Sequence, residues 1–189
     1  MAPANILDAG PSDHLVLFYT SNAELIDRVG TYLLPAIRDG GLAIAIATPV
    51  HRSALGEWLD RAGVDVVAAR ADGHYLELDA ADIIRTFMME DWPSAAEFWA
   101  AISPLIAPAA GAGRPVRTFG EMVSLLWDAD QVSAAIEVEA MWNELGSQYP
   151  FSLCCGYPAR SVTGPSHRDA LAQLYHLHTL AVGPPGEPG

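Results

Sequence analysis

Two carboxylates stand in segments that the sequence otherwise makes apolar. Glu121 lies near the carboxyl end of a buried-strand pattern over residues 116–122, and Glu139 falls with Asn143 on the apolar sector of a helix expected over residues 131–147. An unpaired carboxylate is costly to bury, so each needs a hydrogen-bond partner or a proton. Three roles are open for them: hydrogen bonds that lock loops, contact with a ligand, and catalysis.

Large aromatic side chains end several of the expected strands. Phe18 and Tyr19 close the first strand, Trp127 follows the Glu121 segment, and Tyr157 closes the last strand. If the strands are parallel, these groups lie near one edge of the sheet, where an apolar pocket with a few polar groups binds a small molecule. Aromatic residues at strand ends are also often core residues, and both interpretations stay open.

The usual signatures of catalysis are missing from the sequence. A phosphate-binding loop needs glycines and a lysine that reaches the terminal phosphates, whereas the segment after the first strand is TSNAEL. No Gly-x-Ser-x-Gly sequence marks a serine hydrolase. We therefore expect no catalytic residue and no enzymatic activity; a non-hydrolytic nucleotide binder and a cryptic enzyme are the less favoured alternatives.

The six histidines show no metal-binding pattern. His176 and His178 are two residues apart, so on a helix their side chains point about 200° apart and cannot chelate one ion together. Three others stand at the start of an element or after a turn and are interpreted as capping or surface groups: His14, His51 and His74. A haem needs only one axial histidine and is harder to exclude, but we expect no metal and no cofactor.

The cysteines and the absence of targeting segments indicate the compartment. Cys154 and Cys155 are adjacent in an apolar run, and neighbours on a strand face opposite sides of the sheet, so neither a disulfide nor a shared metal is expected from them. Two buried thiols suit a reducing cytoplasm. With no apolar stretch of membrane-spanning length and no signal-peptide pattern, a cytoplasmic location is expected.

The charge of the chain argues against two classes of partner. The 189 residues carry a net charge of −13, and all ten basic residues are arginines. Phosphate backbones are held by clustered lysines and arginines, so direct nucleic-acid binding is not expected. The same charge disfavours binding to anionic membrane surfaces.

Apolar runs alternate with helical patterns along the chain. Strands are expected over residues 14–19, 42–48, 64–69, 74–78, 116–122 and 151–157, and helices over 23–38, 49–62, 80–89, 93–107 (interrupted at Pro104), 131–147 and 167–181. This alternation predicts a single α/β domain over residues 13–181, with a mostly parallel sheet covered by helices on both faces. Residues 1–12 and the Pro/Gly tail 182–189 are expected to be flexible. Ligands of such sheets bind beyond the carboxyl ends of the strands.

The order of several stretches resembles the MEDS family. These stretches are HLVLFY, IRDGG, AIATPVHRSAL, HYLELDAAD, RPVRTFGEM, EVEAMWNEL and FSLCCGYP, and the resemblance covers residues 13–181. The family is the sensory domain named for methanogens, methylotrophs and the dichloromethane-responsive repressor DcmR. The resemblance implies a degenerate RecA/KaiC-like three-layer sandwich. It also implies a sensor for small hydrocarbon-type molecules, often joined to a DNA-binding, histidine-kinase or ATPase-type module.

The resemblance extends to individual positions. Glu121 matches the glutamate of the family's Gly-Glu-Met stretch, Glu139 and Asn143 match its Glu-x-x-x-Asn helix, and His178 matches a histidine in its last helix. No catalytic role comes with these positions, so Glu139, Asn143 and His178 are expected to support the site structurally. Since no helix-turn-helix or kinase segment is left over, the signal is expected to pass to a separate protein.

Together these observations predict a non-enzymatic sensory domain for a small apolar or amphipathic molecule. Glu121 would bond the ligand or hold the loop that closes on it, in a site at the carboxyl edge of the sheet made of Tyr19, Thr48, His51, Glu121, Trp127 and Tyr157. The expected partner is a regulatory protein such as a kinase or a transcription factor, and a homodimer is compatible with the sequence. The alternative is a ligand-free interaction module in a histidine-kinase or sigma-factor circuit, which predicts an exposed apolar patch and no enclosed cavity.

Overall fold

The computed structural model describes residues 5–183, which fold around a six-stranded sheet. The strands lie in the order β3-β2-β6-β7-β1-β8, and every pairing between them is parallel. Their bounds are β1 (His14–Tyr19), β2 (Leu42–Ala47), β3 (Tyr75–Asp79), β6 (Val116–Gly120), β7 (Ser152–Pro158) and β8 (Leu180–Val182). The central strands are apolar on both sides because helices cover both faces of the sheet.

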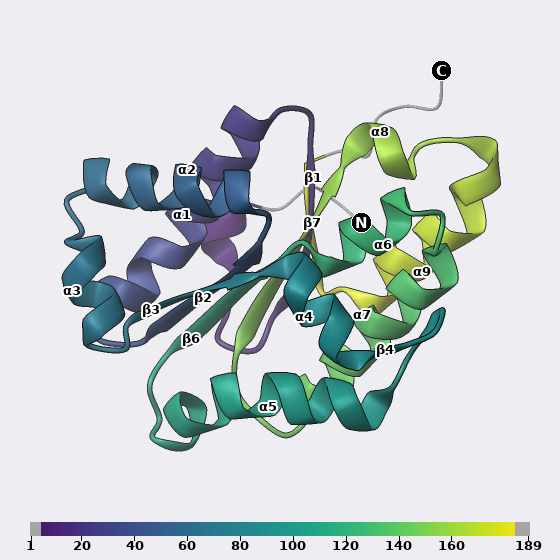
Figure 1. The fold of residues 1–189 in the computed structure, drawn as a ribbon. Helices are drawn as coiled ribbons and strands as arrows, with labels where there is room; N and C mark the ends of the chain where they lie inside the picture. The colour runs from purple at the N-terminus through teal and green to yellow at the C-terminus, as the bar shows by residue number, and fades with distance from the viewer. Residues whose placement is uncertain (1–4, 184–189) are drawn as a thin grey trace.

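The first part of the chain covers one face of the sheet. The elements there are η1 (Ile6–Asp8), α1 (Asn22–Arg38), α2 (Pro49–Arg61) and α3 (Val66–Ala71). They share a core with alternate strand residues, including Leu15 and Leu17 of β1 and Cys154 of β7. Figure 1 shows α1, α2 and α3 together on this side of the sheet.

The second part of the chain covers the opposite face. Its elements are α4 (Ala80–Phe87), α5 (Ala95–Gly111), α6 (Met122–Asp128), α7 (Val132–Gly146), α8 (Ala159–Val162), η2 (Pro165–His167) and α9 (Arg168–Leu177). Their core takes the other alternation of the strands, including Val16, Phe18 and Cys155. A short antiparallel hairpin, β4 (Met88–Met89) with β5 (Trp92–Pro93), joins α4 to α5. The structure thus confirms the predicted α/β fold, and the two cysteines do face opposite sides.

Side-chain caps fix where the helices nearest to the strand ends begin. The hydroxyl of Ser21 accepts a hydrogen bond from the amide of Glu24 at the start of α1, and the hydroxyl of Thr48 accepts one from the amide of His51 at the start of α2. Pro49 occupies the first turn of α2, where its missing amide costs nothing. These caps turn the chain sharply away from the carboxyl ends of β1 and β2.

The strand predicted over residues 64–69 is wrong. Residues 66–71 form helix α3, and the carboxylate of its N-cap residue, Asp65, accepts a hydrogen bond from the amide of Ala68. A short apolar run is compatible with either a strand or a helix, and here the cap decides. The prediction of the neighbouring strand over residues 74–78 is confirmed by β3.

Three helix predictions are also corrected. α5 runs without interruption through Pro104 and Pro108, because its buried side, with Phe98 and Ile102, packs on the sheet and outweighs the lost hydrogen bonds. The last helix stops at Leu177, and the next residues return to the sheet as β8 beside β1. The helix predicted over residues 80–89 ends at Phe87, where the β4–β5 hairpin begins.

The two segments expected to be flexible are described only in part. Within residues 5–12, helix η1 places Ile6 in the core beside α1. At the other end, Val182 is buried in β8, while residues 184–189 of the predicted tail lie outside the described residues. Across residues 5–183, no helix has the length and apolarity that crossing a membrane requires.

The packing of α1 on α2 generates a stability prediction. A Cβ on Gly30 of α1 would lie 2.4 Å from ring carbons of Trp58 on α2. We expect Gly30→Ala to lower the free energy of unfolding by about 1–3 kcal/mol, even though alanine is the better helix former, because overpacking strains the interface. Urea unfolding measures the effect.

The control is Gly111 in α5, where a Cβ meets nothing within 4 Å. Gly111→Ala should not lower the free energy of unfolding. Equal losses in both variants would contradict the packing argument.

Candidate functional site

The carboxylate of Glu121 bridges the carboxyl ends of β2 and β6. Its Oε2 accepts a hydrogen bond from the amide of Thr48 at 2.8 Å, and its Oε1 lies 2.5 Å from Nδ1 of His51. Thr48 follows β2 and caps α2, and His51 stands in the first turn of that helix. The side chain of Glu121 is buried, so the chain itself satisfies both carboxylate oxygens.

The Glu121 contact joins the ends of β2 and β6, and the helices that follow these two strands lie on opposite faces of the sheet. After β2 the chain enters α2 on one face of the sheet, and after β6 it enters α6 on the other. Such a divergence opens the crevice in which α/β sheets bind ligands. In this chain the Glu121 carboxylate, which follows β6, contacts Thr48 and His51, which follow β2, and so links the two sides of this divergence.

Among the described residues, the predicted aromatic site residues make no hydrogen bond to the Glu121 carboxylate. Trp127 and Tyr157 meet edge to face with ring centroids 5.6 Å apart, in the core beneath α7. Tyr19 is buried in the core of the other face, where burial and then the charge of Glu121 raise the pKa of its hydroxyl well above the usual value. The six predicted residues therefore form one hydrogen-bonded group, one aromatic pair and one separate tyrosine.

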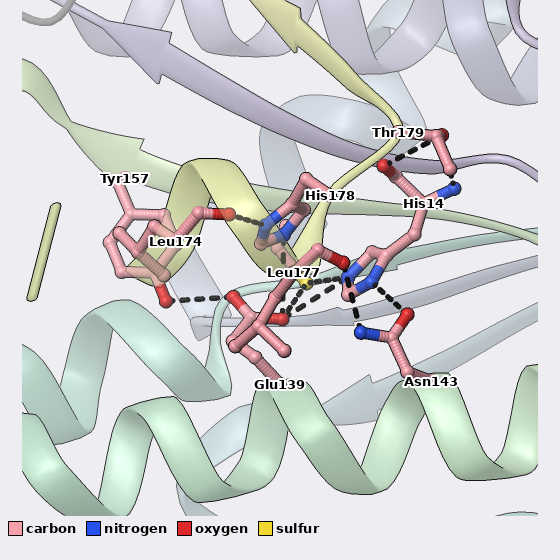
Figure 2. Close-up of polar contacts among 9 residues, drawn as sticks. His14, Glu139, Asn143, Tyr157, Leu174, Leu177, His178 and Thr179 are labelled. Carbon is pink, nitrogen blue, oxygen red and sulfur yellow. Dashed lines mark hydrogen bonds and ion pairs between the residues drawn. The ribbon is translucent and has the colours of Figure 1, made fainter. Parts of the chain in front are cut away.

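The strongest concentration of buried polar groups surrounds Glu139. Its Oε1 accepts a hydrogen bond from the hydroxyl of Tyr157 at 2.7 Å, and its Oε2 accepts one from the thiol of Cys155 at 3.1 Å. Nε2 of His14 lies 3.1 Å from Oε2, and Nε2 of His178 lies 3.5 Å from it. Figure 2 shows both imidazole rings turned toward the carboxylate, with Tyr157 approaching from the opposite side. We call Glu139, His14, Cys155 and His178 the Glu139 cluster.

A second layer of contacts holds the two imidazole rings. Nδ1 of His14 is 2.9 Å from Oδ1 of Asn143, whose amide nitrogen donates to the carbonyl of Leu177 at 2.9 Å. Nδ1 of His178 is 2.7 Å from the carbonyl of Leu174. Asn143 and the carbonyl of Leu174 thus hold the two rings from their Nδ1 sides.

The protonation of the Glu139 cluster follows from burial and from these contacts. Burial by itself would raise the pKa of Glu139, but the neighbouring rings of His178 and His14 outweigh it and hold that pKa well below the usual value. Burial, and secondarily His178, lowers the pKa of His14. Burial raises the pKa of the Cys155 thiol. The cluster thus places an ionised carboxylate in the interior.

Two members of the Glu139 cluster were not singled out from the sequence. His14 was interpreted as a capping or surface group, which is wrong, because it is buried. Cys155 was treated only as a small buried residue. Both lie on the face of the sheet that α7 covers, since β1 pairs with β7 with Val16 opposite Cys155. The alternation of side chains along each strand could have shown that His14 and Cys155 face the core. The pairing of β1 with β7 was needed to show that the two residues meet. The ligand atoms of the four residues all lie within 4.8 Å of one another, so together they could hold a metal ion.

Two of the hollows on the surface lie near the Glu139 cluster or near the aromatic pair of Trp127 and Tyr157. One, of about 360 Å³, is lined by Asp91, Trp92, Asp130, Gln131, Val132, Ser133, Ala134, Ser166 and His167. Another, of about 240 Å³, is lined in part by His14 and Asn143. The first lies outside the site that the sequence suggested, although the ring of His167 is 5.4 Å from that of Trp127.

The start of α1, where a phosphate loop would bind a nucleotide, is closed by its own side chains. Oε2 of Glu24 accepts hydrogen bonds from the amide and the hydroxyl of Thr20, at 2.9 and 2.8 Å. A carboxylate in this position repels phosphate.

The comparison with known families agrees with the resemblance of the seven stretches. The model of a family described as "MEDS: MEthanogen/methylotroph, DcmR Sensory domain" matches residues 13–179. The matched range includes the Glu121 contact and the whole Glu139 cluster. No curated protein matches the chain.

The Glu121 contact predicts a graded loss of stability. Glu121→Ala leaves the amide of Thr48 and the ring of His51 without their buried partner, so the free energy of unfolding should fall by about 2–3 kcal/mol. Glu121→Gln retains one acceptor and the shape of the side chain and should cost about 1 kcal/mol. Urea or thermal unfolding measures both.

The matched control is Glu144→Ala, which removes an exposed carboxylate of α7. It should leave the unfolding free energy unchanged. If Glu121→Ala proved as stable as this control, the carboxylate would not be holding the ends of β2 and β6 together.

Proposed function

Because this chain belongs to the MEDS family of sensory domains, we propose that it binds a small apolar or amphipathic molecule and passes the signal to a separate protein. We propose further that it does so without catalysing a reaction. The proposed binding site is the hollow of about 360 Å³ between the β4–β5 hairpin, the start of α7 and η2. We call it the hairpin hollow.

One observation carries the choice of this hollow: a continuous series of contacts joins it to the buried carboxylate. His167 lines the hollow, and its ring is 5.4 Å from that of Trp127. Trp127 in turn packs on Tyr157 at 5.6 Å, and the hydroxyl of Tyr157 donates to Glu139 at 2.7 Å. A molecule that displaces His167 therefore acts on Glu139 through two aromatic contacts and one hydrogen bond.

The lining of the hairpin hollow suits an amphipathic ligand. Trp92 and Val132 offer apolar surface, while the remaining polar or charged side chains are Asp91, Asp130, Gln131, Ser133, Ser166 and His167. Nδ1 of His167 is buried and has no hydrogen-bond partner, which is costly unless a polar group reaches it. The volume lies at the lower end of the range of small-molecule sites, which favours a ligand of a few heavy atoms.

A second candidate function is supported by the exposed apolar residues of the hairpin. Met89 and Trp92 pair across β4 and β5, and 62% and 51% of their surfaces are exposed. An exposed apolar pair of this kind is suited to contact with another protein. It supports the ligand-free interaction module, and it is equally the surface through which a sensor would contact its regulatory partner.

A variant that fills the hairpin hollow tests the ligand proposal. Ser133 is exposed at the rim, so Ser133→Phe places a ring in the hollow without disturbing the core. We expect small probes, namely dichloromethane and straight-chain alcohols up to butanol, to shift the melting temperature and the tryptophan fluorescence of the native protein. Both shifts should be lost in Ser133→Phe.

The control is Gln148→Phe, an exposed residue just after α7, with the same change of side-chain class. It should respond to the probes as the native protein does. A native mass spectrum of protein from its own cells reports any resident molecule. If neither the probes nor a resident molecule bind, while Met89→Ser abolishes capture of a regulatory protein, the ligand-free module is the correct function.

A further inference from the structure

The Glu139 cluster brings four atoms that bind metals to one point in the core. Nε2 of His14 lies 3.1 Å from Oε2 of Glu139 and 3.4 Å from Sγ of Cys155. Sγ of Cys155 is 3.1 Å from Oε2, and Nε2 of His178 is 3.5 Å from it. A tetrahedral ion with bonds of roughly 2.0–2.3 Å separates its ligand atoms by roughly 3.3–3.8 Å. The spacing of these atoms is therefore close to that of a coordination sphere.

The orientation of both rings is also that of metal-binding histidines. The amide nitrogen of Asn143 donates to the carbonyl of Leu177, so Oδ1 of Asn143 accepts, and Nδ1 of His14 must be the donor to it. Nδ1 of His178 faces the carbonyl of Leu174 and must likewise carry a proton. In a neutral ring the lone pair is then on Nε2, which points toward Glu139. A histidine held by its Nδ1–H in this way is the usual outer support of a metal ligand.

Hydrogen bonds within the chain do not satisfy all four of these atoms. The thiol of Cys155 has one proton, which it donates to Oε2 of Glu139. The side chain of His178 is fully buried, yet its Nε2 has no hydrogen-bond partner. When both rings are neutral, two nitrogen lone pairs face a carboxylate oxygen in the apolar interior. A cation at this point removes the repulsion and satisfies all four atoms at once.

We propose that His14, Glu139, Cys155 and His178 form a buried binding site for one divalent metal ion of the zinc type. Nitrogen, sulfur and oxygen together are the donors that Zn²⁺ accepts, and four protein ligands make a closed, structural site. On binding, the thiol proton of Cys155 leaves to solvent and a metal–sulfur bond forms. The thiolate and the carboxylate then balance the two positive charges of the ion.

The structure offers a route for the ion and a consequence of its binding. His14 and Asn143 line a surface hollow of about 240 Å³ at the amino end of β1, so the ion can enter beside the His14 ring. The ligands come from β1, α7, β7 and the junction of α9 with β8. The ion therefore fastens the last helix and the edge strand to the centre of the sheet. This role is independent of a ligand in the hairpin hollow.

The experiment uses the full chain, stripped of metal with a chelator and then titrated with Zn²⁺ or Co²⁺ alone. We expect one equivalent of Zn²⁺ to bind and to raise the melting temperature. Co²⁺ should give the thiolate-to-cobalt charge-transfer band and the intense visible bands of a tetrahedral site. Elemental analysis of the protein as purified, without a histidine tag, should find the same stoichiometry.

The adjacent cysteines supply a matched pair of variants. Cys155→Ala should abolish the charge-transfer band and weaken Zn²⁺ binding by more than about 100-fold. Cys154→Ala, which alters the opposite face of the sheet, should retain both. Asn143→Ala, which removes only the support of His14, should weaken binding by about 10–100-fold while retaining the band, and it covers the case in which Cys155→Ala does not fold.

Two results would overturn the proposal. The first is that the purified protein contains no metal, and that added Zn²⁺ does not change its melting temperature and added Co²⁺ gives no spectrum of a bound ion. The cluster would then be stabilised by hydrogen bonds without a metal. The other is equal loss of binding in the Cys154 and Cys155 variants. Neither result bears on binding of small molecules in the hairpin hollow, which is measured separately.

Discussion

The burial of one ionised carboxylate constrains this structure more than any other polar contact. Glu139 is completely buried in the interface between α7 and the sheet, and a charge there is tolerated only if its partners are in place. Those partners come from the start of β1, from two positions of β7 and from the end of α9. The register of β1 against β7, the placement of α7 and the turn from α9 into β8 are therefore linked through a single side chain.

The second buried carboxylate has a different task. Glu121 links two strand ends whose helices leave toward opposite faces, at the kind of divergence where α/β sheets bind ligands. The hollow connected to the core lies instead beyond α6, and His167, Trp127 and Tyr157 link it to Glu139. Packed interiors respond to displacement as units rather than continuously. The proposed ligand site is thus joined to the partners of Glu139 by contacts that do not include Glu121.

The sequence allowed most of the architecture to be predicted, and its failures have local causes. The alternation of apolar strands with helices was sufficient for the parallel sheet, because both faces of such a sheet must be covered. It failed at residues 64–69, where the Asp65 cap turns a β-like run into a helix. It failed again after Leu177, because the return to the sheet as β8 depends on a free edge of β1. Neither an edge nor a competing cap is visible in periodicity alone.

For the site, the sequence by itself determined which residues are unusual: Glu121 and Glu139 on apolar patterns, and aromatic side chains at strand ends. Helical periodicity placed Asn143 beside Glu139, and the family resemblance added His178. Only the tertiary structure decided their partners. His14 and Cys155 lie 141 positions apart in the chain and meet because β1 pairs with β7, a choice that no local pattern encodes. The tertiary structure also separated Glu121 from Trp127 and Tyr157, because the direction in which each helix leaves its strand is set by the packing of the two cores and not by the strand itself.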